Sequence, residues 1–323
     1  MKEEVKIIDA TPSKRLYLSI IADYDLYKSI CELADNAIDL WKINQREKEL
    51  EIHITIDVDQ QRINVVDNAG GISSDDLTFI VSPGQSMNDG SVDTIGIFGV
   101  GTKRAVVALS QDVTIRTRQK GFTYQVEIDD EWINNDDDWR LPVYKTTNIE
   151  ENTTSIELVK LRKKVNDISV QKLQYYLSTT YAIFLKDERL KIFLNGTKIM
   201  PKTYEDWAYP PEYPPMFYTC QLNVGVDDKI DMVTLCGLTK QSNDSSGEYG
   251  VYLYCNDRLI ARDLKTIDVG YGTGKAGKPG EEISLARIII QLNGKPEYMP
   301  WNSSKSDINT MLSPLVNTIY QKV

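Results

Sequence analysis

The stretch Leu26–Ile43 has the sequence LYKSICELADNAIDLWKI, and the interpretation of the whole chain depends on it. Its apolar residues recur at steps of three and four positions, which predicts an amphipathic helix over the whole stretch. These residues are Leu26, Ile30, Leu33, Ala37 and Trp41. Asp23 or Asp25 is the expected N-cap of this helix.

A polar flank follows the same helix, about a third of a turn away from the apolar face. It consists of Ser29, Glu32, Asn36 and Asp39. Taken alone, this flank indicates a solvated helix surface. A carboxylate and a carboxamide one turn apart can also present a general base and a metal ligand to one site. Sequence features further along the chain decide between the two interpretations.

Length and composition indicate a globular protein of two domains. A chain of 323 residues is longer than one hydrophobic core usually organises, so two domains are expected. Its 41% apolar and 26% charged residues are ordinary values for soluble proteins. No run approaches the roughly 18 apolar residues of a membrane helix, and the acidic N-terminal residues are unlike a signal peptide. The four cysteines form no CxxC pair, so reduced thiols are expected. We therefore expect a cytoplasmic protein without a membrane segment.

The charge of the chain bears on its partners. The net charge is −10, and no run of lysine and arginine resembles a nucleic-acid-binding arm. A local basic patch could still contact DNA. DNA therefore stays possible as a partner, although the charge does not support it.

Residues 51–58, EIHITIDV, alternate strictly between apolar and polar side chains. This pattern predicts a half-buried strand, with residues 62–66 as its hairpin partner. It also places His53, the only histidine, on the polar face, where an exposed and chemically idle side chain is expected. The sequence therefore gives little support for a Ser-His-Asp triad or for a histidine-based zinc site.

Two glycine-rich turns follow. Residues 67–72, DNAGGI, come directly after a strand and form either a plain turn or a turn with unusually exposed backbone. Residues 82–95 are polar and predict a loop. Residues 96–101, GIFGVG, then run into a predicted helix over 102–109. Glycines at the start of a helix let backbone N–H groups and the helix dipole meet an anion, so this stretch is a plausible phosphate cradle, with Lys103 adding charge.

The remaining sequence alternates between predicted strands and helices. The expected strands cover residues 5–8, 113–118, 122–128, 153–158, 221–226, 231–238, 249–255 and 283–292, with a hairpin over 190–199. Helices are expected over residues 11–22, 168–184 and 307–321. The acidic stretch 129–138 and the glycine-rich stretch 270–280 are predicted loops. The aromatic and proline-rich segment 204–218 marks the expected domain boundary.

Four motifs in fixed order resemble the GHKL superfamily of ATPases, which share the Bergerat nucleotide-binding fold. They are ELADNAID at 32–39, DNAGGI at 67–72, GIFGVG at 96–101 and TTSI at 153–156. The resemblance implies an α/β (α+β) fold in which a Bergerat α/β sandwich with a mixed sheet, residues 1–203, precedes a smaller domain, residues 204–323. That smaller domain would be transducer-like, an α/β domain similar to ribosomal protein S5. The family usually has glycine at the positions of Ala69 and Thr153, which leaves details of the pocket open.

The resemblance also implies roles for individual residues. Glu32 would be the general base, and Asn36 would coordinate Mg²⁺ bound to the phosphates of ATP. Asp67 would accept a hydrogen bond from the adenine amino group. The other implied nucleotide-binding residues are Gly71, Ile72, Gly96, Gly99, Val100, Gly101, Thr102, Lys103 and Thr154. Hydrolysis of a triphosphate needs an in-line water, a metal ion and charge stabilisation, which this set would supply.

The second half of the chain resembles the transducer domains of MORC proteins and, more loosely, of MutL, gyrase B-type subunits and heat-shock chaperones. The resemblance depends on GVYLYCNDRLI at 250–260 and MPWNSSKSD at 299–307. It makes Lys305 the candidate for a basic residue that reaches the γ-phosphate. A sensor histidine kinase is disfavoured because His53 lies inside the nucleotide-binding part.

These features predict a slow ATPase that acts as an ATP-gated conformational switch. ATP binding is expected to favour a homodimer, and a separate protein effector is the expected partner. A DNA-associated or antiviral defence role, as the resemblance to MORC and MutL suggests, is the first expectation. A chaperone-like ATPase acting on protein clients, and an ATP-binding signalling module with little hydrolysis, are the alternatives.

Overall fold

The computed structural model describes residues 14, 21, 24–46, 48–82, 94–96, 101–135, 138–209, 211–239, 247–266 and 285–309. The elements predicted for residues 5–8 and 11–22, the loop 270–280 and most of the predicted loop 82–95 lie wholly or mostly outside this part of the chain. Residues 307–309, the predicted start of a C-terminal helix, are not helical, because Ile308 forms a β-bridge with Trp301.

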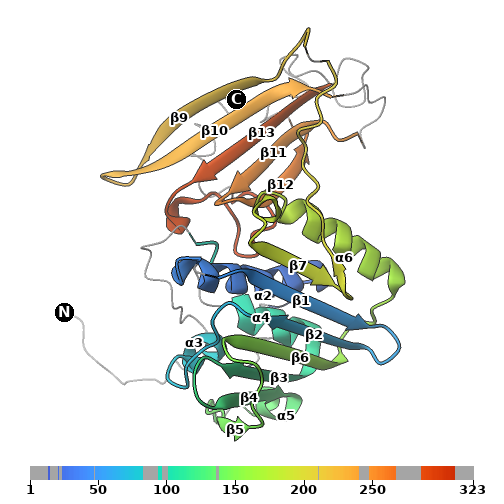
Figure 1. Cartoon of the computed structure of the whole chain (residues 1–323), viewed down its shortest axis with the longest axis vertical. Helices are drawn as coiled ribbons and strands as arrows, with labels where there is room; N and C mark the ends of the chain where they lie inside the picture. The colour runs from blue at the N-terminus through green and yellow to red at the C-terminus, as the bar shows by residue number, and fades with distance from the viewer. Residues whose placement is uncertain are drawn as a thin grey trace, which may run out of the picture.

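Eight strands between residues 50 and 198 form one mixed sheet (Figure 1). They are β1 (Leu50–Asp57), β2 (Arg62–Asp67), β3 (Ser110–Arg118), β4 (Thr123–Asp129), β5 (Tyr144–Thr146), β6 (Thr153–Leu161), β7 (Leu190–Leu194) and β8 (Thr197–Lys198). Their order is β5-β4-β3-β6-β2-β1-β7-β8, and only β1 and β7 pair in parallel among these described strands. The predicted mixed sheet is confirmed.

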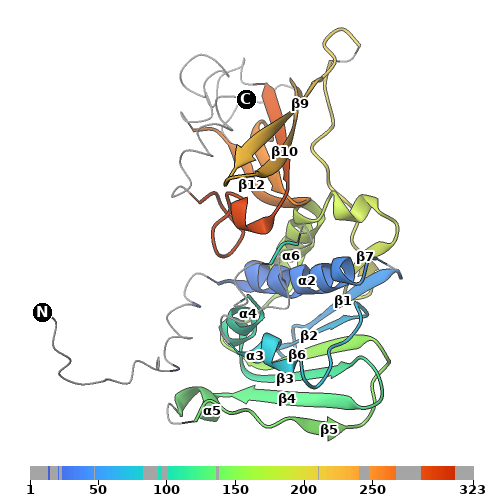
Figure 2. The same cartoon turned by 90° about the vertical axis from the view of Figure 1, so that its left-hand side faces the viewer.

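Helices α2 (Leu26–Ile43) and α4 (Gly101–Leu109) lie on one side of this sheet (Figure 2). Helix α2 has the predicted bounds, and its N-cap Asp25 accepts a hydrogen bond from the backbone N–H of Lys28 at 2.8 Å. The alternating isoleucines of β1 are buried, and His53 on the other face is exposed, as predicted. Burial of one stripe of α2 against one face of the sheet thus makes the α/β sandwich.

The other helical elements are shorter. They are α3 (Leu77–Val81), α5 (Asp130–Asn134), α6 (Asp167–Thr180) and the 3-10 turn η1 (Phe184–Lys186). The prediction of a loop over 129–138 is wrong for its first half. Asp129 caps a helical turn there by accepting the backbone N–H of Trp132 at 2.8 Å. The helix predicted to reach residue 184 ends at Thr180.

A second, five-stranded sheet follows along the chain (Figure 1). Its strands are β9 (Met216–Val224), β10 (Asp228–Leu238), β11 (Gly250–Cys255), β12 (Arg258–Leu264) and β13 (Ala286–Asn293), followed by the 3-10 turn η3 (Pro296–Tyr298). The order is β12-β11-β13-β10-β9. Strand β12 was not predicted. The chain reverses before it in two residues, Asn256 and Asp257, with φ of 48° and 71°, as in a tight hairpin turn.

Strand β9 begins inside the segment predicted as the domain boundary, and buried apolar side chains of both sheets belong to one continuous cluster. The division at residues 203 and 204, and the transducer-like character of the second part, stay predictions.

All four cysteines are free thiols, and Cys31 and Cys255 are buried. Within the described residues, no helix is both long and apolar enough to cross a membrane.

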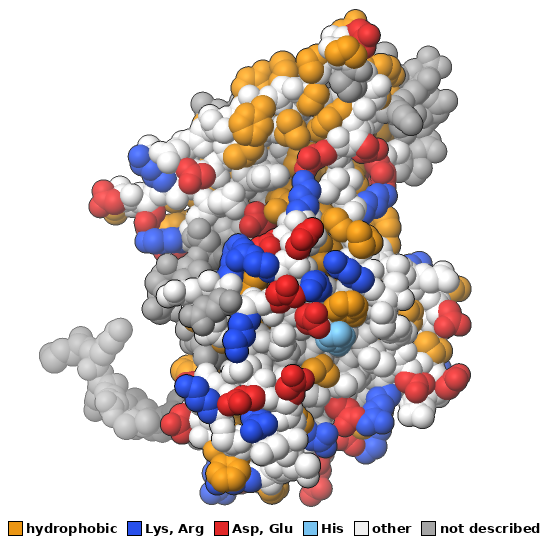
Figure 3. All heavy atoms as spheres, viewed as in Figure 1, with side chains coloured by type: hydrophobic (Ala, Val, Ile, Leu, Met, Phe, Trp, Pro, Cys, Tyr) orange, Lys and Arg blue, Asp and Glu red, His pale blue; other side chains and the backbone are white. Residues whose placement is uncertain are grey.

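The face of the molecule in Figure 3 mixes acidic and basic side chains without a large patch of one sign. Hydrophobic side chains gather on the same face over the five-stranded sheet. Exposed apolar residues in that part of the chain include Met216, Phe217 and Tyr218 on β9. Among the described residues on this face, the basic side chains therefore form no large basic surface of the kind that binds nucleic acid.

Candidate functional site

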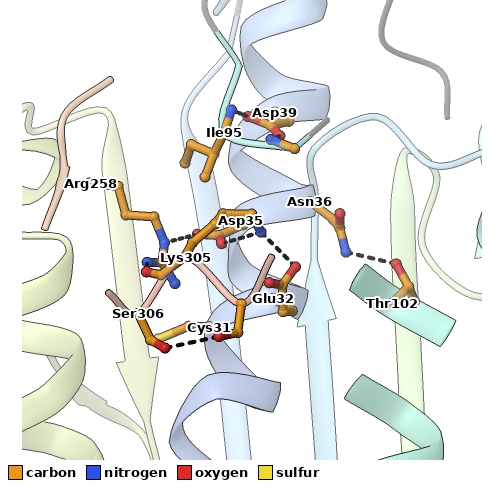
Figure 4. A network of polar contacts seen from close by, with 12 residues as sticks. Cys31, Glu32, Asp35, Asn36, Asp39, Ile95, Thr102, Arg258, Lys305 and Ser306 are labelled. Atoms are coloured by element: carbon orange, nitrogen blue, oxygen red, sulfur yellow. Dashed lines mark hydrogen bonds and ion pairs between the residues drawn. The ribbon is translucent and has the colours of Figure 1, made fainter. Parts of the chain in front are cut away.

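The polar flank of α2 is divided between buried and exposed residues. Glu32 and Asp39 are buried, whereas Asn36 between them is exposed. The amide of Asn36 donates to the hydroxyl of Thr102, in the first turn of α4, at 2.7 Å (Figure 4). A solvated surface therefore describes only Asn36, and the two carboxylates need partners inside the protein.

A buried cluster of four charged side chains supplies those partners for Glu32 (Figure 4). The ammonium of Lys305 lies 2.6 Å from Oε2 of Glu32 and 3.1 Å from Oδ2 of Asp35. The guanidinium of Arg258 lies 2.9 Å from Oδ1 of Asp35. Two negative and two positive charges thus balance, which is the condition under which ionised groups are tolerated in a protein interior.

The charges of this cluster shift one another's pKa. Burial alone would raise the pKa of Asp35, but Arg258 and Lys305 outweigh burial and hold it below its ordinary value. Burial would lower the pKa of Lys305, and here Glu32 and Asp35 prevail and raise it. Asp35 and Lys305 are therefore both ionised at neutral pH.

Two tyrosines complete the surroundings of the cluster. The hydroxyl of Tyr181 lies 2.7 Å from Oδ1 of Asp35 and 2.8 Å from the carbonyl of Cys31. The hydroxyl of Tyr24 donates to Glu32 at 3.3 Å. The sequence motifs indicated Glu32 and Lys305 as site residues but did not indicate Asp35, Arg258 or Tyr181. The available signal was Asp35 itself, an acid one helical turn from Glu32 on the same helix.

The predicted adenine-binding residues lie together where β2 and β6 pair. Asp67, the last residue of β2, is directly opposite Thr154 in register. The hydroxyl of Thr154 lies 3.1 Å from that of Thr117 on β3, and Thr117 also accepts the backbone N–H of Ile72 at 2.8 Å. The structure thus brings together Asp67, Ile72 and Thr154, and their role in binding adenine stays a prediction.

The turn after β2 has the special geometry expected of a glycine turn. Gly71 has φ of 64°, and a Cβ atom there would lie 2.2 Å from the carbonyl oxygen of Arg118. Asp67 accepts the backbone N–H of Ala69 at 3.0 Å. Burial of its carboxyl group, opposed only by that hydrogen bond, raises the pKa of Asp67 to about 7. Such a group can change its protonation near neutral pH, which is typical of functional sites.

The predicted phosphate side is built around α2 and the start of α4. Asp39 accepts the backbone N–H groups of Ile95 at 2.7 Å and Gly96 at 2.6 Å, and burial raises the pKa of its carboxyl to about 7. A Cβ atom at Gly101 would lie 2.2 Å from Oε2 of Glu32, so only glycine lets α4 begin this close to that carboxylate. Three predicted phosphate-binding residues therefore lie next to the polar side chains of α2, namely Gly96, Gly101 and Thr102.

Of the other predicted phosphate-binding residues, Lys103 contacts the backbone of α3, and Gly99 and Val100 are not described. The ammonium of Lys103 donates to the carbonyl of Phe79 on α3, and burial lowers the pKa of Lys103 to about 8. A contact with phosphate would require this bond to be released. Gly99 and Val100 lie outside the described residues.

The second sheet also contacts this side of the site, through the hairpin between β11 and β12. The side-chain amide of Asn256 donates to the carbonyls of Thr94 and Gly294, each at 3.0 Å. Its carbonyl oxygen accepts the backbone N–H of Gly294, also at 3.0 Å. Residues 94–96 are thus held from one side by α2 and from the other by the hairpin.

The donor set suits a magnesium ion that is bound mainly by phosphate. Within the described residues, no group of three or more histidine, cysteine, aspartate or glutamate side chains could hold a metal ion. Mg²⁺ typically takes one or two protein ligands, keeps several waters and completes its shell with substrate phosphates. The exposed carboxamide oxygen of Asn36 fits that pattern.

Comparison with known proteins agrees with this geometry. Residues 24–163 match the family model described as "Histidine kinase-, DNA gyrase B-, and HSP90-like ATPase". None of the curated proteins matches the chain. The matched segment runs from the residue before the N-cap of α2 to just after β6, so it contains Asp67, Glu32 and Asp35 but not Tyr181, Arg258 or Lys305.

Proposed function

Residues 24–163 form a GHKL-type ATPase domain with the Bergerat α/β sandwich, and on this premise we propose that the chain binds Mg-ATP and hydrolyses it slowly as a conformational switch. Asp67 and Thr154 bind the adenine, Asn36 holds Mg²⁺, and Glu32 accepts the proton of the attacking water. When bound, Mg²⁺ neutralises charge on the phosphates. Positioning and charge stabilisation supply most of the catalysis of such a reaction.

The observation that supports the switch is the 2.6 Å contact between Lys305 and Glu32. Lys305 follows the five-stranded sheet in sequence, whereas Glu32 belongs to α2, so the contact connects the second part of the chain to the catalytic carboxylate. While the ammonium of Lys305 occupies Oε2 of Glu32, a water cannot take that position beside this oxygen. The phosphates of ATP compete with Glu32 for the ammonium of Lys305. When Lys305 binds a phosphate, Glu32 is released to act as a base, and the change at Lys305 is transmitted to the second sheet.

Partners form part of the same proposal. We expect the ATP-bound chain to dimerise and to act on a separate protein effector, in a DNA-associated or defence system. The support for this is the resemblance to MORC and MutL proteins in the motifs at 250–260 and 299–307. A conformational change that depends on nucleotide is the kind of signal that such a partner can read.

The test combines turnover, binding and size. Wild type, Glu32→Gln and Asp67→Asn would be compared for phosphate release, for binding of a fluorescent ATP analogue, and for mass by light scattering with Mg²⁺ and non-hydrolysable ATP. Glu188→Gln, at an exposed position, is the matched control. We expect Glu32→Gln to bind ATP without hydrolysing it, and Asp67→Asn to lose binding. Turnover unchanged in Glu32→Gln would remove Glu32 as the base, and wild type that binds no ATP would refute the function.

A further inference from the structure

Asp35 contacts both cationic side chains of the buried cluster. Its Oδ2 lies 3.1 Å from the ammonium of Lys305, and its Oδ1 lies 2.9 Å from Nε of Arg258. Oδ1 also lies 2.7 Å from the hydroxyl of Tyr181. Both oxygens are therefore engaged, and the side chain is buried. An Asp that is buried and holds three other side chains is placed to orient those groups.

Arg258 extends the influence of Asp35 to the backbone of Lys305. While its Nε binds Asp35, its Nη1 donates to the carbonyl of Lys305 (Figure 4). The backbone there needs such support, because Lys305 has φ of 50°, a conformation that is uncommon for residues other than glycine. Its N–H is in turn held by the carbonyl of Asn302 at 2.9 Å. Asp35 thus holds Lys305 directly at the ammonium and indirectly at the carbonyl.

The two acids that contact Lys305 differ in what else they can do. Glu32 is the base of the proposed reaction and must release the ammonium before it accepts a proton. Asp35 has no such role, and its hydrogen bonds with Arg258 and Tyr181 do not involve the ammonium of Lys305. Asp35 therefore keeps the ammonium of Lys305 near the phosphates even when Glu32 releases it. This restraint favours binding, because an unrestrained lysine side chain loses conformational entropy when it binds a phosphate.

We propose that Asp35 is a positioning residue that sets Lys305, through direct contact and through Arg258, so that its ammonium meets the terminal phosphate of a nucleoside triphosphate. This inference rests on the proposed function. It assigns to Asp35 the ability of the site to distinguish a triphosphate from a diphosphate. The affinity for the nucleoside belongs to Asp67 and its neighbours, and the affinity for the first two phosphates belongs to the residues at the start of α4.

The experiment measures the triphosphate preference, defined as the Kd of Mg-ADP divided by the Kd of a non-hydrolysable Mg-ATP analogue. It uses the full chain as wild type, Asp35→Asn, Lys305→Met and the double variant. Lys305→Met is expected to lower the preference about 10- to 100-fold, the range of hydrogen bonds to charged groups. Asp35→Asn is expected to lower it about tenfold with the Kd of ADP within about twofold of wild type. The double variant should equal Lys305→Met alone, because Asp35 acts through Lys305.

Two further variants make the test robust. Tyr181→Phe removes one hydrogen bond to Asp35 and keeps the ring, so it should give a smaller loss that also disappears in the Lys305→Met background. Asp187→Asn, which changes a surface Asp paired with Arg189 at 2.8 Å, is the matched control and should leave the preference unchanged. Near-ultraviolet circular dichroism verifies that each variant is folded.

The outcomes separate the inference from the function on which it rests. If wild type binds both nucleotides but Asp35→Asn and Tyr181→Phe keep the full triphosphate preference, or if the losses multiply in the double variants, the positioning role is refuted and the proposed function stands. If wild type binds neither nucleotide, the proposed function fails and the inference fails with it.

Discussion

Replacing Lys305 by methionine is expected to lower the free energy of unfolding by about 3–5 kcal/mol when no nucleotide is present. The side chains of Lys305 and Glu32 are 5% and 3% exposed and lie 2.6 Å apart. Methionine preserves most of the volume of lysine but removes its charge, which leaves two buried carboxylates with one cation. The cost is that of a buried uncompensated charge, and it exceeds the net contribution of an ordinary hydrogen bond.

The double variant Glu32→Gln with Lys305→Met restores the balance. Only Asp35 and Arg258 then remain charged, at 2.9 Å from one another, so the double variant should lie within about 1.5 kcal/mol of wild type. Since the pKa of Lys305 is raised above its ordinary value, its contribution is fully present at pH 7 and is lost only as pH rises through that raised pKa.

Urea unfolding followed by circular dichroism measures these differences as shifts of the midpoint at unchanged slope. The control is Lys186→Met, because Lys186 pairs with Glu205 at 2.7 Å with side chains 46% and 41% exposed. An exposed pair contributes at most about 1 kcal/mol. A loss in Lys305→Met no larger than in Lys186→Met, or a double variant as unstable as the sum of its single variants, would refute the idea of a charge-balanced cluster.

Three further predictions concern other parts of the site. Gly71→Ala should abolish nucleotide binding and destabilise the chain by several kcal/mol in thermal melts, whereas Gly196→Ala, with a similar φ of 78° but nothing within 4 Å, should cost only about 1–2 kcal/mol. ATP affinity should rise as pH increases from 6 to 8, because the pKa of Asp67 is about 7 and the adenine amino group donates to the ionised carboxylate. The variant Asp67→Asn, measured over the same pH range, should lack this part of the pH dependence. Asn256→Ala should lose about 2–3 kcal/mol in urea unfolding, and Asn256→Gly somewhat less, because glycine accepts φ of 48°. Equal stability of Asn256→Ala and wild type would contradict the hydrogen bonds to Thr94 and Gly294.

Sequence patterns were sufficient for the elements whose signals are local. The period of apolar residues gave both ends of α2, and strict alternation gave β1 and its exposed His53. The motifs after β2 and before α4 also located Asp67 and Gly101 correctly within the fold. In each case the deciding residues lie within about one turn or one strand of one another, where spacing alone predicts geometry.

The contacts that sequence could not predict join distant residues. Asp35 lies 223 positions from Arg258 and 270 from Lys305, so no local spacing indicates that they meet. An acid next to Asn36 on this helix is typical of a solvated surface, but here Asp35 is buried and contacts Tyr181, Arg258 and Lys305. Strand β12 was missed for a different reason, because the two-residue turn of Asn256 and Asp257 lacks the glycine that usually marks such a hairpin in sequence.

The sharing of charges between the two parts of the chain has a practical consequence for fragments. A fragment cut before β9 would keep Glu32 and Asp35 but lose Arg258 and Lys305, so a neutral cluster would become one of net charge −2. Both carboxylates would then lack their cationic partners, and the uncompensated negative charge would repel a triphosphate, which is itself an anion. Weak ATP binding by such a fragment would measure missing counterions and would say little about the intact protein.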